Sequence, residues 1–228
     1  MMMAIQQTPQ ADDFKRKLRD VLQRETLNSR ATNVARHANV YVSGDHSDMI
    51  YFIDSGQVKL LMHSTEGKEC LLAIHSDGDI FGELSLSGFG SRQETATAMK
   101  TTMLKQVPCA KFFALLSRAL LFEGFVRYLT VRVADQQQVI ANFVTIGSEE
   151  RLGQKLLQMA RTMGKKDQSS IRIELRISQE ELAEMVGTTR PRISEFMQRF
   201  HHLGLIETKD HVFIINEKKL TDYLAQIS

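Results

Sequence analysis

The chain has 228 residues, 43% of them hydrophobic and 25% charged, and a formal net charge of +2. This length accommodates two modest domains, and the composition is typical of a globular protein in water. Its apolar runs are shorter than the ~20 residues of a membrane-spanning helix, and no signal-peptide pattern opens the sequence. Cys70 and Cys109 are too few for a disulfide framework, which agrees with a reducing compartment. We therefore expect a cytoplasmic protein that does not contact a membrane, and the small net charge decides nothing about nucleic-acid binding.

The first half of the chain predicts a helix followed by a β-rich domain. Residues 1–24 are expected to form an arm that passes into a charged helix, whose apolar side consists of Phe14, Leu18, Val21 and Leu22. Short apolar runs bounded by glycine-bearing turns then recur at residues 39–42, 49–53, 58–62 and 70–74. Strands at a spacing of roughly 8–12 residues, with turn signals between them, predict an all-β sandwich or barrel. We place this domain at residues 25–118.

A long helix is predicted next, over residues 119–145, after a shorter helical segment at residues 111–116. Apolar residues recur along it at alternating steps of four and three, the pattern of a seam between two helices packed side by side. The seam comprises Phe122, Val126, Leu129, Val133, Gln136, Ile140 and Phe143. Gln136 is polar and needs a partner, so it would either fix the register or meet a ligand. A helix lying on its own domain is the alternative; we favour a homodimer, with residues 119–147 as dimerisation helix and hinge.

Residues 148–228 predict a C-terminal domain that contains two helices joined by a tight turn. Ser178 caps the first of these helices, and Glu181 three residues later completes a capping box. Gly187 ends this helix, because a residue without Cβ can turn the chain where others clash. Thr189 is expected to cap the second helix, and Pro191 falls in its first turn, where a missing N–H costs little.

The second of the two helices has an apolar stripe and a polar face. The stripe consists of Ile193, Phe196, Met197 and Phe200. Arg190 and Arg192 remain at the outward N-terminal end, and such an end suits the DNA major groove, where first-turn side chains reach base edges. An ordinary two-helix corner with a solvated charged face is the alternative. Apolar runs at residues 204–206 and 212–215 add a β-hairpin, so we predict a winged helix that binds DNA. The candidate DNA contacts are Gln179, Thr188, Thr189, Arg190, Arg192, Ser194 and Arg199.

Residues 78–86, with the sequence GDIFGELSL, resemble the phosphate-binding cassette of cyclic-nucleotide-binding domains. Together with the long helix and the winged helix, they make the chain resemble the catabolite activator protein/FNR (Crp/Fnr) superfamily of bacterial transcription regulators, from about Leu27 to Ile215. The resemblance implies an α+β fold with an N-terminal cyclic-nucleotide-binding-type β-roll (jelly roll), a long dimerisation helix and a C-terminal winged helix-turn-helix. It also implies a homodimer on near-palindromic double-stranded DNA, with RNA polymerase as a further partner if the protein is an activator.

The resemblance further assigns an effector role to the cassette. Gly82 and Glu83 match the family's glycine and ribose-binding glutamate, and Arg92, nine positions after Glu83, matches its phosphate-binding arginine. Gln93 and Glu94 replace the usual small pair; with a longer loop, Gln93 would take the place of the arginine. A charge on Glu94 would oppose an anionic ligand by ~1–4 kcal/mol. The candidate effector contacts are Gly82, Glu83, Leu84, Ser85, Arg92, Gln93, Gln136 and Gln137. Two alternatives stay open, a cyclic nucleotide as effector or a cassette kept only as scaffold.

Arg190 matches the guanine-reading arginine of the family's recognition helix. Two other readers are replaced by Pro191 and Glu195, so the base preference is expected to differ from the best-known family consensus. A bidentate arginine–guanine contact is worth roughly 1–3 kcal/mol of discrimination.

Other chemistries find little support in the sequence. An iron–sulfur cluster needs more thiolates than two cysteines supply, and Cys70 with His75 in a predicted strand is more typical of packing than of haem binding. We see no catalytic and no metal-ligand pattern, so we expect neither an enzyme nor a metal site. The remaining rivals are a regulator that needs no effector and a nucleotide-binding module that acts on a partner protein.

Overall fold

The computed structural model describes residues 9–24, 30–65, 69–88, 90–167 and 170–227. The chain divides into two compact units, one ending at Arg132 and the other beginning at Val133. The boundary falls inside the long helix α3 (Phe122–Thr145), so this helix is shared by both units. The first residues of the predicted N-terminal arm, 1–8, lie outside the described residues.

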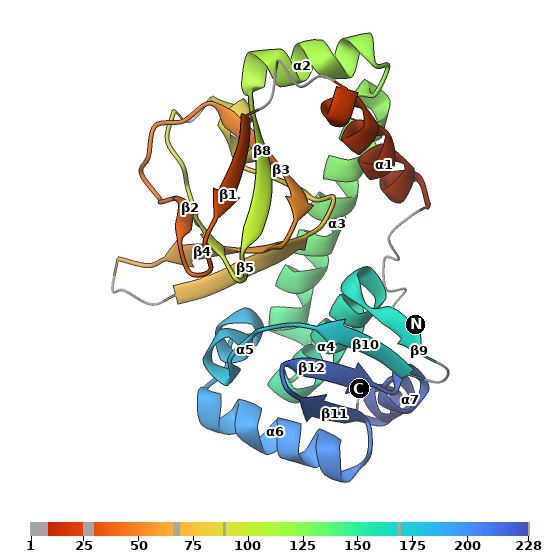
Figure 1. Ribbon diagram of the computed structural model, residues 1–228. Coiled ribbons are helices and arrows are strands. Elements are labelled where there is room, and N and C mark those ends of the chain that lie inside the picture. The colour runs from red at the N-terminus through yellow and green to blue at the C-terminus, as the bar shows by residue number, and fades with distance from the viewer. Residues whose placement is uncertain (1–8, 25–29, 66–68, 89, 168–169, 228) are drawn as a thin grey trace. The chain divides into compact units, whose positions relative to one another are not determined.

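The first unit is a pair of antiparallel sheets with helices packed on one of them (Figure 1). Its elements are α1 (Pro9–Arg24), β1 (Arg30–Val34), β2 (Asn39–Tyr41), β3 (Met49–Ser55), β4 (Gln57–His63), β5 (Glu69–Ser76), β6 (Ile80–Phe81), the 3-10 helix η1 (Glu83–Ser87), β7 (Thr95–Ala98), β8 (Thr102–Pro108), α2 (Cys109–Arg118) and the first part of α3. One sheet has the strand order β1-β8-β3-β6 and the other β2-β7-β4-β5. The predicted β-roll is confirmed.

Strand β3 explains how this unit acquires two cores. Its side chains point alternately to the two faces of the sheet. Tyr51 and Ile53 join the core between the two sheets, whereas Ile50 and Phe52 join the core beneath the helices. Both faces are therefore buried, which is why the sequence reads as a continuous apolar run at this strand.

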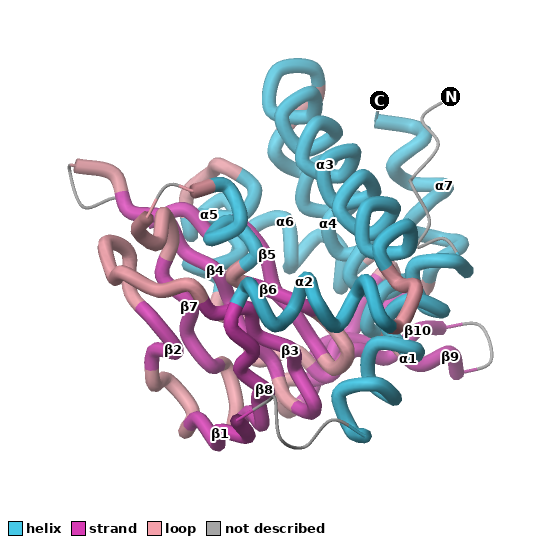
Figure 2. Tube along the Cα trace, turned by 90° about the horizontal axis from the view of Figure 1, so that it is seen from above, coloured by secondary structure: helices cyan, strands magenta, loops and turns pink. Residues whose placement is uncertain are grey.

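The second core is covered by α1, α2 and the beginning of α3, and Figure 2 shows α2 crossing over β3. The predicted apolar side of the N-terminal helix is confirmed, because Phe14, Leu18 and Leu22 are buried in this core. Helix α3 begins at Phe122 rather than at about residue 119, as was predicted. The chain at Leu120 has a left-handed φ of 55°, which interrupts the helical path between α2 and α3.

The second unit is a winged helix-turn-helix. After the end of α3 it contains α4 (Ser148–Met163), β9 (Lys165–Asp167), β10 (Ser170–Glu174), α5 (Gln179–Val186), α6 (Arg190–His202), β11 (Ile206–Lys209), β12 (Val212–Ile215) and α7 (Glu217–Ile227). Its sheet has the order β11-β12-β10-β9. On β10, Ile171 and Ile173 are buried while Arg172 and Glu174 are exposed, so one face of this sheet covers the core. Strand β11 starts later than the predicted run at residue 204, because Gly204 is in a left-handed turn with φ 63°.

Local signals fix the two helices of the motif. The predicted capping box is present, since the Ser178 side chain accepts from the Glu181 N–H and the Glu181 carboxylate accepts from the Ser178 N–H. Gly187 ends α5 in the left-handed conformation, as expected. The predicted cap at Thr189 is wrong: this residue occupies the N-cap of α6, but its side chain makes no capping hydrogen bond. The following Pro191 lacks one of the N–H groups that such a cap would bind.

Among the described helices, none combines the length and apolarity that a membrane crossing requires.

Candidate DNA interface and effector cassette

Helix α6 carries its arginines on the side away from the core. Ile193 and Phe200 are fully buried, and Phe196 and Met197 are nearly so, which fixes the rotation of the helix. Arg190 and Arg192 are exposed at its N-terminal end, next to the tight turn that begins at Gly187. The predicted DNA contacts lie on this motif: Gln179, Thr189, Arg190, Arg192 and Arg199 are exposed, and Thr188 and Ser194 are half-buried.

Arg199 is already ion-paired within the protein. Its guanidinium lies 2.6 Å from the carboxylate of Glu149 on α4 and 3.2 Å from that of Glu195, one turn earlier on α6. The hydroxyl of Tyr223 on α7 donates to the same Glu149 at 2.7 Å. Glu149 therefore holds the end of α6 against α4 and α7, a role that the sequence does not reveal because its partners lie 50 and 74 positions away.

In the cassette, a left-handed glycine brings the backbone close to Arg92. Gly82 has φ 79°, and a Cβ there would lie 2.9 Å from Nη1 of Arg92 and 3.0 Å from the ring of Tyr51. Only glycine permits this approach. The structure thus brings together the predicted pair Gly82 and Arg92, as an Nη1–H donated to the Gly82 carbonyl at 2.8 Å.

Both terminal nitrogens of the Arg92 guanidinium are hydrogen-bonded within the protein, whereas its buried Nε has no hydrogen-bond partner. Only 3% of this residue is exposed. Nη2 donates to the carbonyl of Met49 and to the hydroxyl of Ser47, and the guanidinium lies 4.3 Å from the centre of the Tyr41 ring. A phosphate would have to compete with these bonds for a cation that faces inward.

A carboxylate is buried beside this arginine. Glu94 is 1% exposed, and its Oε1 accepts a hydrogen bond of 2.7 Å from the hydroxyl of Tyr41. Burial and, after it, the charge of Glu94 raise the pKa of Tyr41 well above its ordinary value. Tyr41 therefore bridges Arg92 and Glu94, with its ring on one and its hydroxyl on the other. As bonded here, these residues do not fit an anionic phosphodiester.

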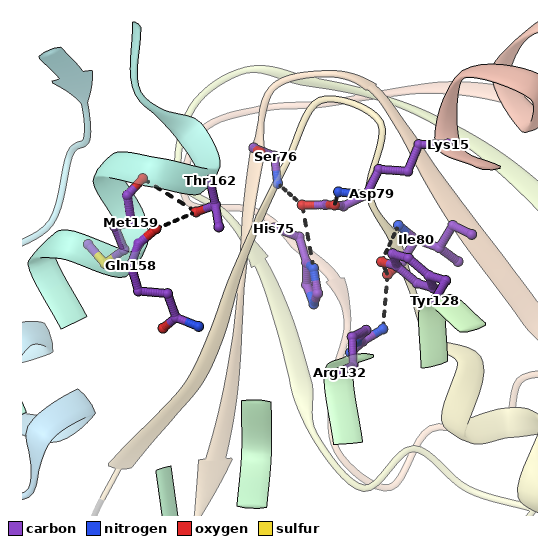
Figure 3. A network of polar contacts seen from close by, with 10 residues as sticks. All are labelled: Lys15, His75, Ser76, Asp79, Ile80, Tyr128, Arg132, Gln158, Met159 and Thr162. Carbon is purple, nitrogen blue, oxygen red and sulfur yellow. Dashed lines mark hydrogen bonds and ion pairs between the residues drawn. The ribbon is translucent and has the colours of Figure 1, made fainter. Parts of the chain in front are cut away.

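Glu83, the predicted ribose contact, is also engaged. Its Oε1 lies 2.9 Å from Nη1 of Arg132 on α3, and the two side chains are only 12% and 19% exposed. Arg132 also donates to the carbonyl of Ile80 at 3.3 Å, next to the hydroxyl of Tyr128 (Figure 3). Burial alone would lower the pKa of Arg132, but the charge of Glu83 outweighs it and raises that pKa. This pair spans almost fifty positions, and no local signal predicts it.

A second polar group joins β5 to α1 nearby. Oδ1 of Asp79 accepts from the ammonium of Lys15 at 2.6 Å, and Oδ2 accepts from the Ser76 N–H at 2.8 Å and lies 3.8 Å from Nδ1 of His75 (Figure 3). Burial would raise the pKa of Asp79, but the nearby His75 ring and the charge of Lys15 hold that pKa below its usual range. His75 is thus buried and paired with Asp79, while Cys70 is exposed. Within the described ranges, no group of three or more His, Cys, Asp and Glu side chains is arranged to hold a metal ion.

The other predicted effector contacts are less enclosed. Ser85 donates to the Gly82 carbonyl at 2.8 Å and is 3.1 Å from the thiol of Cys109. Leu84 is exposed, and the amide of exposed Gln93 bonds to Ser91. Gln136 and Gln137 are exposed on the part of α3 that belongs to the second unit.

The predicted dimer seam is an exposed apolar stripe along α3. Its members Phe122, Val126, Val133, Ile140 and Phe143 are 45%, 51%, 51%, 66% and 43% exposed. Leu129 packs against the core beneath the helices, and Gln136 is exposed. So many exposed large apolar residues on one helix are unusual for a monomer.

The comparisons with known proteins agree with this architecture. The family model for a cyclic nucleotide-binding domain matches residues 31–119, and that for a Crp-like helix-turn-helix domain matches residues 150–223. The chain is 27% identical, over 81% of its length and 83% of the relative's, to a CRP-like cAMP-activated global transcriptional regulator of Mycobacterium tuberculosis. It is 23% identical, over 90% of its length and 81% of the relative's, to the fumarate and nitrate reduction regulatory protein of Escherichia coli.

Solved structures share the fold. A CooA mutant from Carboxydothermus hydrogenoformans superposes with a TM-score of 0.71 at 24% identity, covering 86% of this chain and 88% of that one. FixK2 from Bradyrhizobium japonicum gives 0.70 at 17% identity, covering 85% and 96%. A β-roll with a nucleotide-type cassette, a long helix and a winged helix-turn-helix therefore occur here in the family's order, and the chain belongs to the Crp/Fnr superfamily of bacterial transcription regulators.

Proposed function

We propose that the protein is a homodimeric regulator in which two copies pair along α3 and present two α6 helices to one duplex. The observation that carries the proposal is the exposed apolar stripe on α3, combined with the outward Arg190 and Arg192 on α6. Two recognition helices related by a two-fold axis reach successive major grooves when they lie about 34–36 Å apart. The expected site is a near-palindrome whose half-sites have this separation.

Arg190 and Arg192 are the proposed base readers. Both stand in the first turn of α6, where side chains reach base edges, and a guanidinium bonds both acceptors of guanine. Arg199 is proposed to contact phosphate only by exchanging its ion pairs with Glu149 and Glu195, so its contribution should be smaller than its charge suggests.

The DNA proposal is tested by selecting bound duplexes from a random pool and measuring affinity for the selected site. Arg190→Ala should weaken specific binding by about 5- to 150-fold, the equivalent of a lost bidentate pair of about 1–3 kcal/mol. Arg36→Ala, an exposed arginine of the β-roll, serves as the control and should leave specific binding unchanged. Equal losses in both variants, or no enriched duplex, would contradict the proposal.

For the β-roll, we propose that the cassette acts as an internally bonded scaffold and not as a cyclic-nucleotide site. The support is the inward Arg92 with its carbonyl partners, the buried Glu94 beside it, and the pairing of Glu83 with Arg132. Together they engage both terminal nitrogens of Arg92 and one carboxylate oxygen of Glu83, whereas Nε of Arg92 and Oε2 of Glu83 are buried without a hydrogen-bond partner.

Cyclic AMP is the competing candidate, favoured by the matching cyclic nucleotide-binding family model and by the M. tuberculosis relative, which is a cAMP-activated regulator. Calorimetry with cyclic AMP, cyclic GMP and cyclic di-GMP distinguishes the scaffold role from nucleotide binding. We expect no saturable heat with any of them. Saturable binding that is abolished by Glu83→Ala would instead assign the cassette to the nucleotide.

A further inference from the structure

The end of α3 and the turn of the helix-turn-helix meet directly in the second unit. A Cβ built on Gly187 would lie 2.3 Å from Cε1 of Phe143, 3.1 Å from its Cδ1 and 3.3 Å from its Cζ. The ring of Phe143 therefore occupies the space where a side chain at the turn would stand. Phe143 was predicted only as a member of the dimer seam, but part of its ring packs on its own chain.

Arg151, near the start of α4, bonds the carbonyl ends of two helices at once. Nε donates to the Val186 carbonyl at 2.8 Å and Nη2 to that of Gly187 at 3.4 Å, at the end of α5. Nη1 donates to the Ile146 carbonyl at 2.6 Å, just after α3. The last carbonyls of a helix lack partners within the helix, and the negative end of its dipole favours a cation. One guanidinium thus caps both α3 and α5.

The two features form one contact. The guanidinium of Arg151 lies 5.0 Å from the centre of the Phe143 ring, so the residue that caps both helices also stacks on the residue that fills the turn. We call Phe143, Arg151 and Gly187 the turn clamp.

A row of amides strengthens the same junction. Gln138 donates to Asn142 at 2.8 Å, Asn142 to Gln154 at 2.8 Å, and Gln154 to Glu150 at 3.1 Å. The row runs from α3 to α4, so α4 is held to the end of α3 by polar bonds on one face and by Arg151 on another.

The clamp faces the DNA-reading helix. Arg192, one of the proposed base readers, lies close enough to Arg151 for its charge to oppose that of Arg151. Gly187, which the clamp holds, precedes the first residue of α6, Arg190, by three positions, so a shift at the clamp would move the turn that leads into α6.

We propose that Arg151 and Phe143 are positioning residues, which fix the helix-turn-helix to the end of the dimer helix and so set the separation of the two recognition helices. The inference rests on the proposed dimeric DNA binding. Neither residue needs to touch DNA in this scheme: they decide which half-site spacing the dimer accepts.

The test measures affinity of the full chain for the duplex selected from a random pool and for versions with one base pair added or removed between the half-sites. One base pair rotates a half-site by about a tenth of a turn. Arg151→Lys keeps the charge but loses the forked bonds. We expect it to weaken binding at the selected spacing by about 2- to 30-fold, to bind the altered spacings nearly as well as the selected one, and to keep the salt dependence, since no phosphate contact is lost.

Arg161→Lys is the matched control, because Arg161 lies on the same helix and pairs with Glu217 away from the turn. It should keep the spacing preference. Phe143→Leu, with the dimer verified by ultracentrifugation, is the second variant if Arg151→Lys does not fold. A spacing preference retained in Arg151→Lys, or an equal loss at every spacing, would overturn the inference. Absence of any selected duplex for the unaltered chain would instead overturn the proposed function itself.

Discussion

Removal of one partner from the ion pair between Glu83 and Arg132 should destabilise the fold far more than the same change in an exposed ion pair of equal length. The N–O distance in this pair is 2.9 Å, and the side chains of Glu83 and Arg132 are 12% and 19% exposed. The ion pair between Glu123 and Arg127, both on α3, has an N–O distance of 2.8 Å and side chains that are 80% and 58% exposed. Glu83→Gln leaves an almost buried guanidinium without its counter-charge. Breaking a buried pair in this way costs about 3–5 kcal/mol, which we reduce to about 2–4 kcal/mol for the remaining exposure. Glu123→Gln should cost less than about 1 kcal/mol.

Urea unfolding of the full chain, followed by circular dichroism at one fixed protein concentration, measures both costs. The concentration must be fixed because dimerisation stabilises the folded state by mass action. The double variant Glu83→Gln/Arg132→Met removes both charges and should recover most of the loss. If Glu83→Gln were as mild as Glu123→Gln, the pair would be solvated, and Glu83 would be free to accept a ribose hydroxyl after all.

Three further predictions concern single positions. Gly204→Ala and Gly187→Ala both place alanine at φ 63°, which costs roughly 1–2 kcal/mol of strain. Gly187→Ala should lower the free energy of unfolding by about 1–3 kcal/mol more, because its Cβ overlaps the Phe143 ring. Equal urea midpoints for the two variants would contradict this packing at the turn. Asp79 has a depressed pKa in the folded state, so its contribution to stability is present above pH about 4 and is lost as the pH falls below it. Asp79→Asn should therefore be less stable at neutral pH and show a shallower acid limb in its stability profile, whereas an unchanged limb would speak against the assignment. Ser178→Ala should cost about 0.5–2 kcal/mol through loss of the capping box, measured as a lower unfolding midpoint; an unchanged midpoint would mean that water replaces the cap.

The sequence predicts features that depend on neighbours along the chain. The capping box needs only Ser178 and a glutamate three residues later, and the left-handed end of α5 needs only Gly187. The apolar run at residues 49–53 predicts strand β3, and the helical spacing of the apolar residues predicts the buried stripe of α6. These signals are local because one turn or one strand suffices to produce them.

The chemistry of the cassette could not be predicted in the same way. The family resemblance places Arg92 at the expected phosphate position, but its inward orientation depends on the carbonyls of Met49 and Gly82, which tertiary folding brings to it. The pairing of Glu83 with Arg132 depends equally on how α3 packs on the β-roll. A local rule also fails at Thr189, which has the residue type of a cap and occupies the N-cap position, yet its side chain makes no capping hydrogen bond.

The bridge that Tyr41 makes between Arg92 and Glu94 has an evolutionary consequence. The partners of the guanidinium are neutral carbonyls and hydroxyls, and the opposing carboxylate comes from a single position. Under the proposed scaffold role, the difference between this protein and a nucleotide-responsive relative lies in the charge beside the arginine and not in backbone shape. A lineage on this scaffold could gain or lose a chemical signal through very few codon changes while its DNA-reading half stays intact.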